Sequence, residues 1–109
     1  MIPLQLHPAA EREIEAVADD YEQQRPGLGV RFAQELQQSF ERIRRFPGLY
    51  PVEQEPVRVA PIHRFPYSIF YAERADRILI LAVGHQHRAP GFWINRLQSI
   101  DPPSEETQA

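Results

Sequence analysis

Two histidines and an arginine follow the most apolar stretch of this sequence: His85, His87 and Arg88. Arg64 precedes a second strand-like segment, so all four side chains lie where expected strands begin or end. An imidazole exchanges protons near neutral pH, and a guanidinium binds a phosphate through paired hydrogen bonds. These side chains could therefore supply an acid, a base and phosphate-binding cations. The alternative is structural: the histidines hydrogen-bond backbone at a strand end, and Arg88 pairs with an acid such as Glu73.

A metal site is a second chemistry that the histidines allow. His85 and His87 are two residues apart, so in an extended strand both face the same side and can reach one ion. A zinc site needs at least a third protein ligand, for which His63 is a candidate. Two histidines alone are a weak signal, and the chain has no cysteine to supply a thiolate. We therefore expect no metal and no cofactor.

Contact with another protein is a further use expected of these side chains, because aromatic and arginine residues dominate the energetics of protein interfaces. The residues expected to contact a target or a partner protein are Arg58, Arg64, His87, Arg88 and Trp93. The competing explanation is that Trp93 packs a final helix onto the sheet, while Arg58 and Arg64 are solvated charges.

Composition limits the classes of function. A chain of 109 residues forms one domain with one core, and no apolar run is long enough to span a bilayer. The N-terminus lacks the basic and apolar regions of a secretory signal, so we expect a cytoplasmic protein with no membrane partner. The net charge of −3 disfavours general coating of nucleic acid, although residues 51–97 hold six arginines against four acidic residues.

The N-terminal half is expected to be a strand followed by two helices. Apolar residues alternate over 2–6, which is typical of a short strand. Apolar residues at helical spacing predict a helix over 8–24, with a proline in its first turn and His7 expected to help cap it. Pro26-Gly27 breaks this helix, and a second apolar stripe predicts another helix that ends at Phe46.

The C-terminal half is expected to be a sheet. Residues 47–56 contain three prolines and predict a loop, and short strands are expected at 57–60 and 67–73. The segment 78–83 is apolar on both faces, which predicts a central strand covered by helices on at least one side. Gly84 is expected to end that strand.

A last short helix is expected to begin at Ala89-Pro90 and to carry Trp93 and Arg96. Residues 98–109 are expected to be a disordered acidic tail. The sequence therefore predicts an α+β fold in a single domain over residues 1–97. Its parts are an N-terminal strand, a helical hairpin, a mainly antiparallel sheet and a short C-terminal helix.

Four segments resemble the RelE/ParE superfamily, the toxins of bacterial type II toxin–antitoxin pairs. They are YEQQRPGLGVRF at 21–32, RFPGLYP at 45–51, FPYSIFY at 65–71 and AVGHQHRAPGFW at 82–93. No single segment is specific, but together they are similar to plasmid-stabilisation toxins over about residues 2–97. The resemblance implies the fold expected above. It also implies a cognate antitoxin that wraps the toxin in a hetero-oligomer and blocks it.

The superfamily divides by mechanism, and three positions favour one branch. RelE-like members cut mRNA on the ribosome without metal, while ParE-like members inhibit DNA gyrase. The RelE-like branch has arginines at the positions of Ser68 and Gln86 and a tyrosine at the position of Phe92. This chain therefore lacks two cations and one hydroxyl that the RelE-like mechanism requires at these positions.

The expected function is that of a ParE-like toxin, which inhibits growth by binding a protein target, with DNA gyrase favoured, and which an antitoxin neutralises. One alternative is a ribosome-dependent mRNA interferase, a metal-independent endoribonuclease. In that case His85, His87, Arg64 and Arg88 replace the missing groups. A further alternative is a decayed toxin that retains only antitoxin binding.

Overall fold

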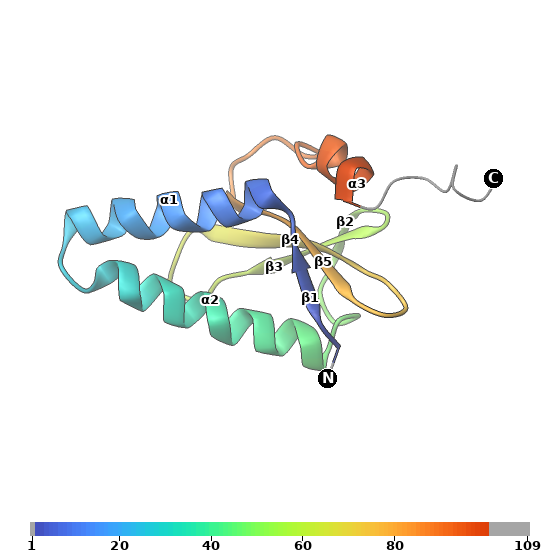
Figure 1. Cartoon of the computed structure of the whole chain (residues 1–109), viewed down its shortest axis with the longest axis horizontal. Helices are drawn as coiled ribbons and strands as arrows, with labels where there is room; N and C mark the ends of the chain where they lie inside the picture. Colours follow the sequence, from blue (N-terminus) through green and yellow to red (C-terminus); the bar gives the residue numbers. More distant parts are fainter. Residues whose placement is uncertain (1, 101–109) are drawn as a thin grey trace.

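The computed structural model describes residues 2–100 and has an α+β fold (Figure 1). The strands are β1 (Leu4–Leu6), β2 (Val52–Gln54), β3 (Val57–Pro61), β4 (Tyr67–Glu73) and β5 (Ile78–His85). The helices are α1 (Pro8–Gln24), α2 (Leu28–Arg45) and α3 (Ile94–Ile100). Among these strands the order is β1-β5-β4-β3-β2, with β1 parallel to β5 and the other neighbours antiparallel. The expected fold class and mainly antiparallel sheet are confirmed.

The helices α1 and α2 form a hairpin that covers one face of the sheet (Figure 1). As expected, His7 caps α1: its ring Nδ1 accepts a hydrogen bond of 2.9 Å from the Ala9 backbone N–H. The chain reverses at Gly27, where φ is +90°, a conformation that glycine adopts without a Cβ clash. The Glu22 carboxylate accepts hydrogen bonds from the backbone N–H groups of Gly27 and Gly29, which fixes the reversal.

The sheet has an apolar core on each face, and β5 contributes to both. The core under the helical hairpin includes Phe32, Phe40, Ile43, Ile69, Tyr71, Ile78 and Ile80. The core on the opposite face, beside α3, includes Val57, Phe70, Leu79, Leu81, Ala82 and Trp93. The prediction of a central strand covered by helices is therefore confirmed for β5. Within the described chain, neither α1, α2 nor α3 is long and apolar enough to cross a bilayer.

The short strand β2 lies inside the segment 47–56, so the prediction that all of this segment is a loop is wrong. The three residues of β2 are exposed and pair with the start of β3 at the edge of the sheet. An exposed strand of this length shows no alternation of buried and exposed side chains. Its sequence therefore gives no strand signal.

The strand β5 continues through Gly84 to His85, so the prediction that Gly84 ends it is wrong. Gly84 keeps its place in the ladder opposite Ser68, and His85 pairs with Tyr67. The glycine provides space rather than a turn, because a Cβ at this position would lie 2.9 Å from the ring of Phe92.

The helix α3 begins at Ile94, later than the predicted start at Ala89-Pro90. Residues 86–93 form turns instead, with Gly91 at a φ of +79°. Because α3 ends at Ile100, residues 98–100 belong to the helix rather than to the expected tail. The rest of that expected tail, residues 101–109, lies outside the described residues.

Candidate functional site

The end of β5 brings the two histidines together. The rings of His85 and His87 lie 5.1 Å apart between centroids, and the Tyr67 ring meets His85 edge-on at 5.4 Å. The His87 backbone N–H donates to His85 Nδ1 at 3.2 Å, so a neutral His85 carries its proton on Nε2. His85 is half-buried and oriented by this contact with the backbone, whereas His87 is exposed. The structural explanation therefore accounts for His85, and His87 remains open to an external partner.

Arg88 is held by an aromatic ring rather than by an acid. Its guanidinium carbon lies 4.0 Å from the centroid of the Phe92 ring, and that of Arg96 lies 5.4 Å from the same centroid. Phe92 also meets Phe70 edge-on, with the centroids 5.1 Å apart. No ion pair joins Arg88 to Glu73 within residues 2–100, so the expected pairing of these two is wrong.

Arg64 lies at the same end of the sheet as the histidines, since Tyr67 pairs with His85 and the Gln86 backbone N–H donates to the Pro66 carbonyl at 3.0 Å. It occupies the turn between β3 and β4 at a φ of +74° and lines a pocket together with Arg25 and Arg31. In the part of the chain that the structure describes, no hydrogen bond joins Arg64 to His85 or His87. The four residues expected to replace the RelE-like catalytic groups therefore come from two neighbouring segments, the β3–β4 turn and the end of β5, with no hydrogen bond between Arg64 and either histidine within residues 2–100.

Arg58 holds the loop that follows α2. Its Nη1 donates to the Tyr50 backbone carbonyl at 2.6 Å, and the Tyr71 hydroxyl donates to the Pro47 carbonyl at 2.6 Å. Burial raises the pKa of the Tyr71 hydroxyl to about 12, so this donor stays protonated at neutral pH. Arg58, expected as a contact residue, therefore already donates a hydrogen bond to the Tyr50 carbonyl within the fold. A partner protein that binds Arg58 would have to replace this bond or leave it intact.

Trp93, also expected as a contact residue, is buried at 1% exposure in the core beside α3. Its indole Nε1–H donates to Glu53 Oε2 at 2.8 Å, and the same oxygen accepts from the Gly91 backbone N–H at 3.0 Å. The side chain has almost no surface to present to a partner. Its burial agrees with the competing explanation, in which it packs the last helix onto the sheet.

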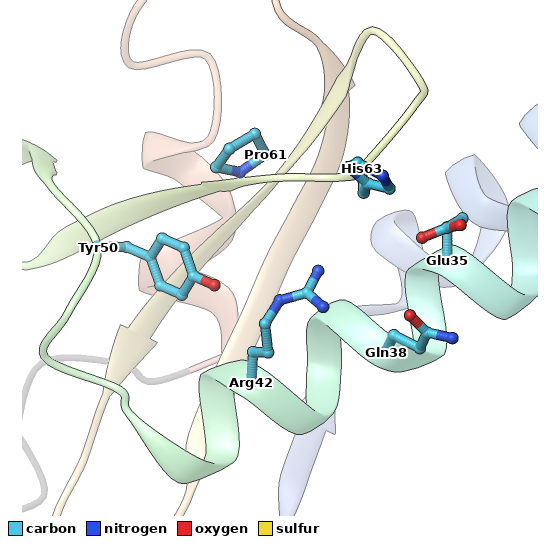
Figure 2. Close-up of a pocket in the computed structure, with 6 residues that line it drawn as sticks. All are labelled: Glu35, Gln38, Arg42, Tyr50, Pro61 and His63. Atoms are coloured by element: carbon cyan, nitrogen blue, oxygen red, sulfur yellow. The ribbon is translucent and has the colours of Figure 1, made fainter.

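A groove not predicted from the sequence lies between α2 and the sheet (Figure 2). Its volume is about 530 Å3, and its lining residues are Glu35, Gln38, Arg42, Tyr50, Pro61 and His63. Glu35 and His63 lie at one end and Tyr50 at the other, with the Arg42 guanidinium between them (Figure 2). Arg42 also donates to Ser39 Oγ at 3.1 Å.

The spacing of the groove residues on α2 is the one sequence signal for this surface. Glu35, Gln38 and Arg42 are three and four residues apart, which places them on one face of the helix beside its apolar stripe. His63, the candidate third metal ligand, lines this groove rather than joining a ligand group. Among the described residues, no cluster of three potential metal ligands occurs.

Comparison with known proteins identifies the family. A family model described as "ParE toxin of type II toxin-antitoxin system, parDE" matches residues 4–90. No curated protein is similar enough to match. Among solved structures, the chain is similar to one from a "Chromosomal ParDE TA system from P. aeruginosa", with a TM-score of 0.62 and 21% sequence identity. This match covers 78% of the present chain and 96% of the other, and it supports the fold. Because the family model spans most of the chain, the chain belongs to the ParE toxin family of type II toxin–antitoxin systems.

Proposed function

We propose that this toxin inhibits growth in the cytoplasm by binding a protein target, DNA gyrase, rather than by cutting RNA. The observation that carries the proposal is the environment of Ser68, where the RelE-like pattern has an arginine. Ser68 is 6% exposed and lies within β4, opposite Pro61 on one side and Gly84 on the other. A buried serine at this position supplies no cation to a scissile phosphate.

The position of Phe92 supports the same proposal. The RelE-like pattern has a tyrosine hydroxyl here, but the Phe92 ring is occupied by the guanidinium groups of Arg88 and Arg96. The exposed side chains of Arg64, His87 and Arg88 are the surface that we propose for target contact. Arg58 and Trp93, the other two expected contact residues, bond to the Tyr50 carbonyl and to Glu53 and are not included in this proposed surface.

A supercoiling assay with purified gyrase tests the target. The purified chain is expected to inhibit supercoiling, and the cognate antitoxin is expected to restore it by forming a hetero-oligomer with the toxin. The double variant His87→Ala/Arg88→Ala should inhibit less, whereas Arg12→Ala, which removes an exposed charge on α1, should inhibit as the unchanged chain does. Unchanged supercoiling at a large molar excess of toxin would count against gyrase as the target.

The paired rings of His85 and His87 favour a second candidate, the ribosome-dependent mRNA interferase. Mapping of RNA 5′ ends shortly after induced expression separates the candidates. New cuts in translated messages that disappear in His87→Ala or Arg88→Ala would favour the interferase. Growth arrest without new cuts favours gyrase, and the absence of growth arrest favours a decayed toxin that only binds its antitoxin.

A further inference from the structure

A second, smaller pocket lies where the turn of the helical hairpin meets the turn between β3 and β4. Its volume is about 180 Å3, and its lining residues are Arg25, Leu28, Arg31, Arg64 and Phe65. The three arginines come from three separate segments. Arg25 caps the C-terminus of α1, Arg31 lies in the first turn of α2, and Arg64 lies in the β3–β4 turn. We call this pocket, with its three arginines, the arginine pocket.

The charges of the arginine pocket are not neutralised within the described chain. The guanidinium groups of Arg25, Arg31 and Arg64 form no ion pair and no hydrogen bond with residues 2–100. Glu22 is the acid of this turn, but its carboxylate already accepts the backbone N–H groups of Gly27 and Gly29. Three like charges around one hollow repel one another, and a bound anion would remove that repulsion.

The backbone of Arg64 is a separate indication of function. Its φ of +74° lies in the left-handed region, which glycine adopts readily and a side chain with a Cβ does not. Non-glycine residues held in sparsely populated backbone conformations cluster at active sites and ligand-binding sites. Here the exposed Arg64 guanidinium lies beside the pocket although a glycine at this position would relieve the backbone strain.

The other walls of the pocket are apolar and fixed. Phe65 meets the rings of Tyr21 and Phe32 edge-on, with centroids 4.9 Å and 5.2 Å away, so its position is set by the core. Leu28 begins α2 and is half-buried. The pocket therefore combines three cations with two apolar side chains.

We propose that the arginine pocket binds the phosphate group of a nucleotide. A guanidinium offers a planar fork that matches phosphate oxygens, and three of them match a phosphate dianion better than a single carboxylate. The apolar walls of Leu28 and Phe65 accommodate the sugar or base that carries the phosphate. The phosphate comes either from a free nucleotide or from a nucleic-acid backbone. The proposal does not depend on which target the toxin inhibits.

Titration of the full chain, followed by backbone amide NMR, tests this site. Thymidine 5′-monophosphate is expected to shift the amide signals of residues 25–31 and 64–65, whereas thymidine without phosphate is not. Arg25→Gln and Arg31→Gln should each weaken binding by about tenfold, because each removes a charge-assisted hydrogen bond. A short DNA duplex serves as the second probe. If the duplex shifts the same signals and the mononucleotide does not, the site takes backbone phosphate, and the proposal still holds.

Arg64→Gly is the decisive variant, because glycine accepts the φ of +74° and the fold is expected to be preserved. It should lose affinity about tenfold while its stability is unchanged or increased. Arg12→Gln is the matched control: it removes one exposed charge at the opposite end of α1 and should bind as the unchanged chain does. Equal affinity of Arg64→Gly and Arg12→Gln would overturn the proposal. So would binding of a glutamate-rich peptide at these residues while neither phosphate probe shifts them.

Discussion

Arg96 and Glu13 form a bidentate ion pair: Arg96 Nη1 donates to Glu13 Oε1 and Arg96 Nη2 donates to Glu13 Oε2, both at 2.8 Å. Glu13 Oε1 also accepts the Val83 backbone N–H at 3.0 Å, and Arg96 Nη1 donates to the Leu81 carbonyl at 3.3 Å. The strand β1 pairs with β5 only over Ile78–Ile80. The ion pair thus bonds backbone groups of β5 beyond the reach of β1, and it fastens α3 to α1 and to the sheet.

Removing this carboxylate should destabilise the fold. We expect Glu13→Ala to lower the free energy of unfolding by about 2–3 kcal/mol, because it leaves the Val83 N–H without its acceptor and leaves the Arg96 guanidinium with only the Leu81 carbonyl as an acceptor within residues 2–100. Urea unfolding followed by circular dichroism measures the change. Glu15→Ala removes an exposed carboxylate from the same helix and is expected to change stability by less than about 0.5 kcal/mol. Similar losses in the two variants would contradict this role of Glu13.

His7 should make the stability depend on pH. Its Nδ1 accepts from the Ala9 N–H, and its Nε2 lies 2.8 Å from Ser99 Oγ, whose hydroxyl donates to the Arg96 carbonyl. This arrangement requires a neutral ring. Burial, followed by the charges of Arg96 and Arg12, lowers the pKa of His7 below 6.5.

A folded-state pKa below the unfolded value means that the unfolded chain binds a proton first as the pH falls. The contribution of His7 is therefore fully present above a pH of about 6.5 and is lost as the pH falls towards the folded pKa. Asparagine caps a helix without titrating, so His7→Asn should lose less stability than the unchanged chain between about pH 7.5 and about pH 5.5. Urea midpoints at the two pH values measure the difference, and parallel losses in both proteins would rule out His7 as the source.

The bond between Glu53 and Trp93 should be visible in fluorescence, because the chain has one tryptophan. Glu53→Ala leaves the buried indole N–H and the Gly91 N–H without an acceptor. We expect a stability loss of about 1–2 kcal/mol and a shift of the emission to longer wavelength as water reaches the indole. Glu55→Ala, which removes a nearby exposed carboxylate, is the control and should leave the emission unchanged. An unchanged spectrum in Glu53→Ala would contradict the bond.

The elements that the sequence predicts are those whose pattern is local. The helix α1 has helical apolar spacing and a cap from His7, and its predicted range agrees with the structure. The prediction of a central strand succeeds because β5 is apolar on both faces. By contrast, glycine is a common turn signal, and only the position of the Phe92 ring explains why a glycine occupies this place in the strand.

The site is less predictable than the fold, because its contacts join distant segments. His85 and His87 are close in sequence, but their rings meet through the turn that follows β5, where the His87 backbone N–H donates to His85 Nδ1, and not through a shared strand. Arg25 and Arg31 converge with Arg64 only after the helical hairpin packs beside the β3–β4 turn. The approach of the Arg64 turn to the end of β5 likewise depends on the pairing of β4 with β5, and no spacing in the sequence encodes it.

Gly29 should be the glycine least tolerant of a side chain in the helical hairpin. A Cβ at this position would lie 2.5 Å from the Ala18 backbone carbonyl oxygen of α1, and 3.0 Å from a Glu22 carboxylate oxygen. Backbone cannot yield as a side chain can, so the two helices must separate. We expect Gly29→Ala to lower the free energy of unfolding by about 1–3 kcal/mol in urea.

The matched control for this prediction is Gly48→Ala, because a Cβ there has nothing within 4 Å and Gly48 is not among the glycines with a positive φ. Both substitutions reduce the freedom of the unfolded chain equally, so Gly48→Ala should be neutral or stabilising by up to about 1 kcal/mol. Alanine also favours helix over glycine by about 1 kcal/mol, which acts against the expected loss in α2. A net destabilisation by Gly29→Ala therefore requires a steric clash that costs more than the reduced freedom of the unfolded chain and the helix propensity of alanine together contribute. Equal stability of the two variants would show that α1 and α2 are not in close contact at Gly29.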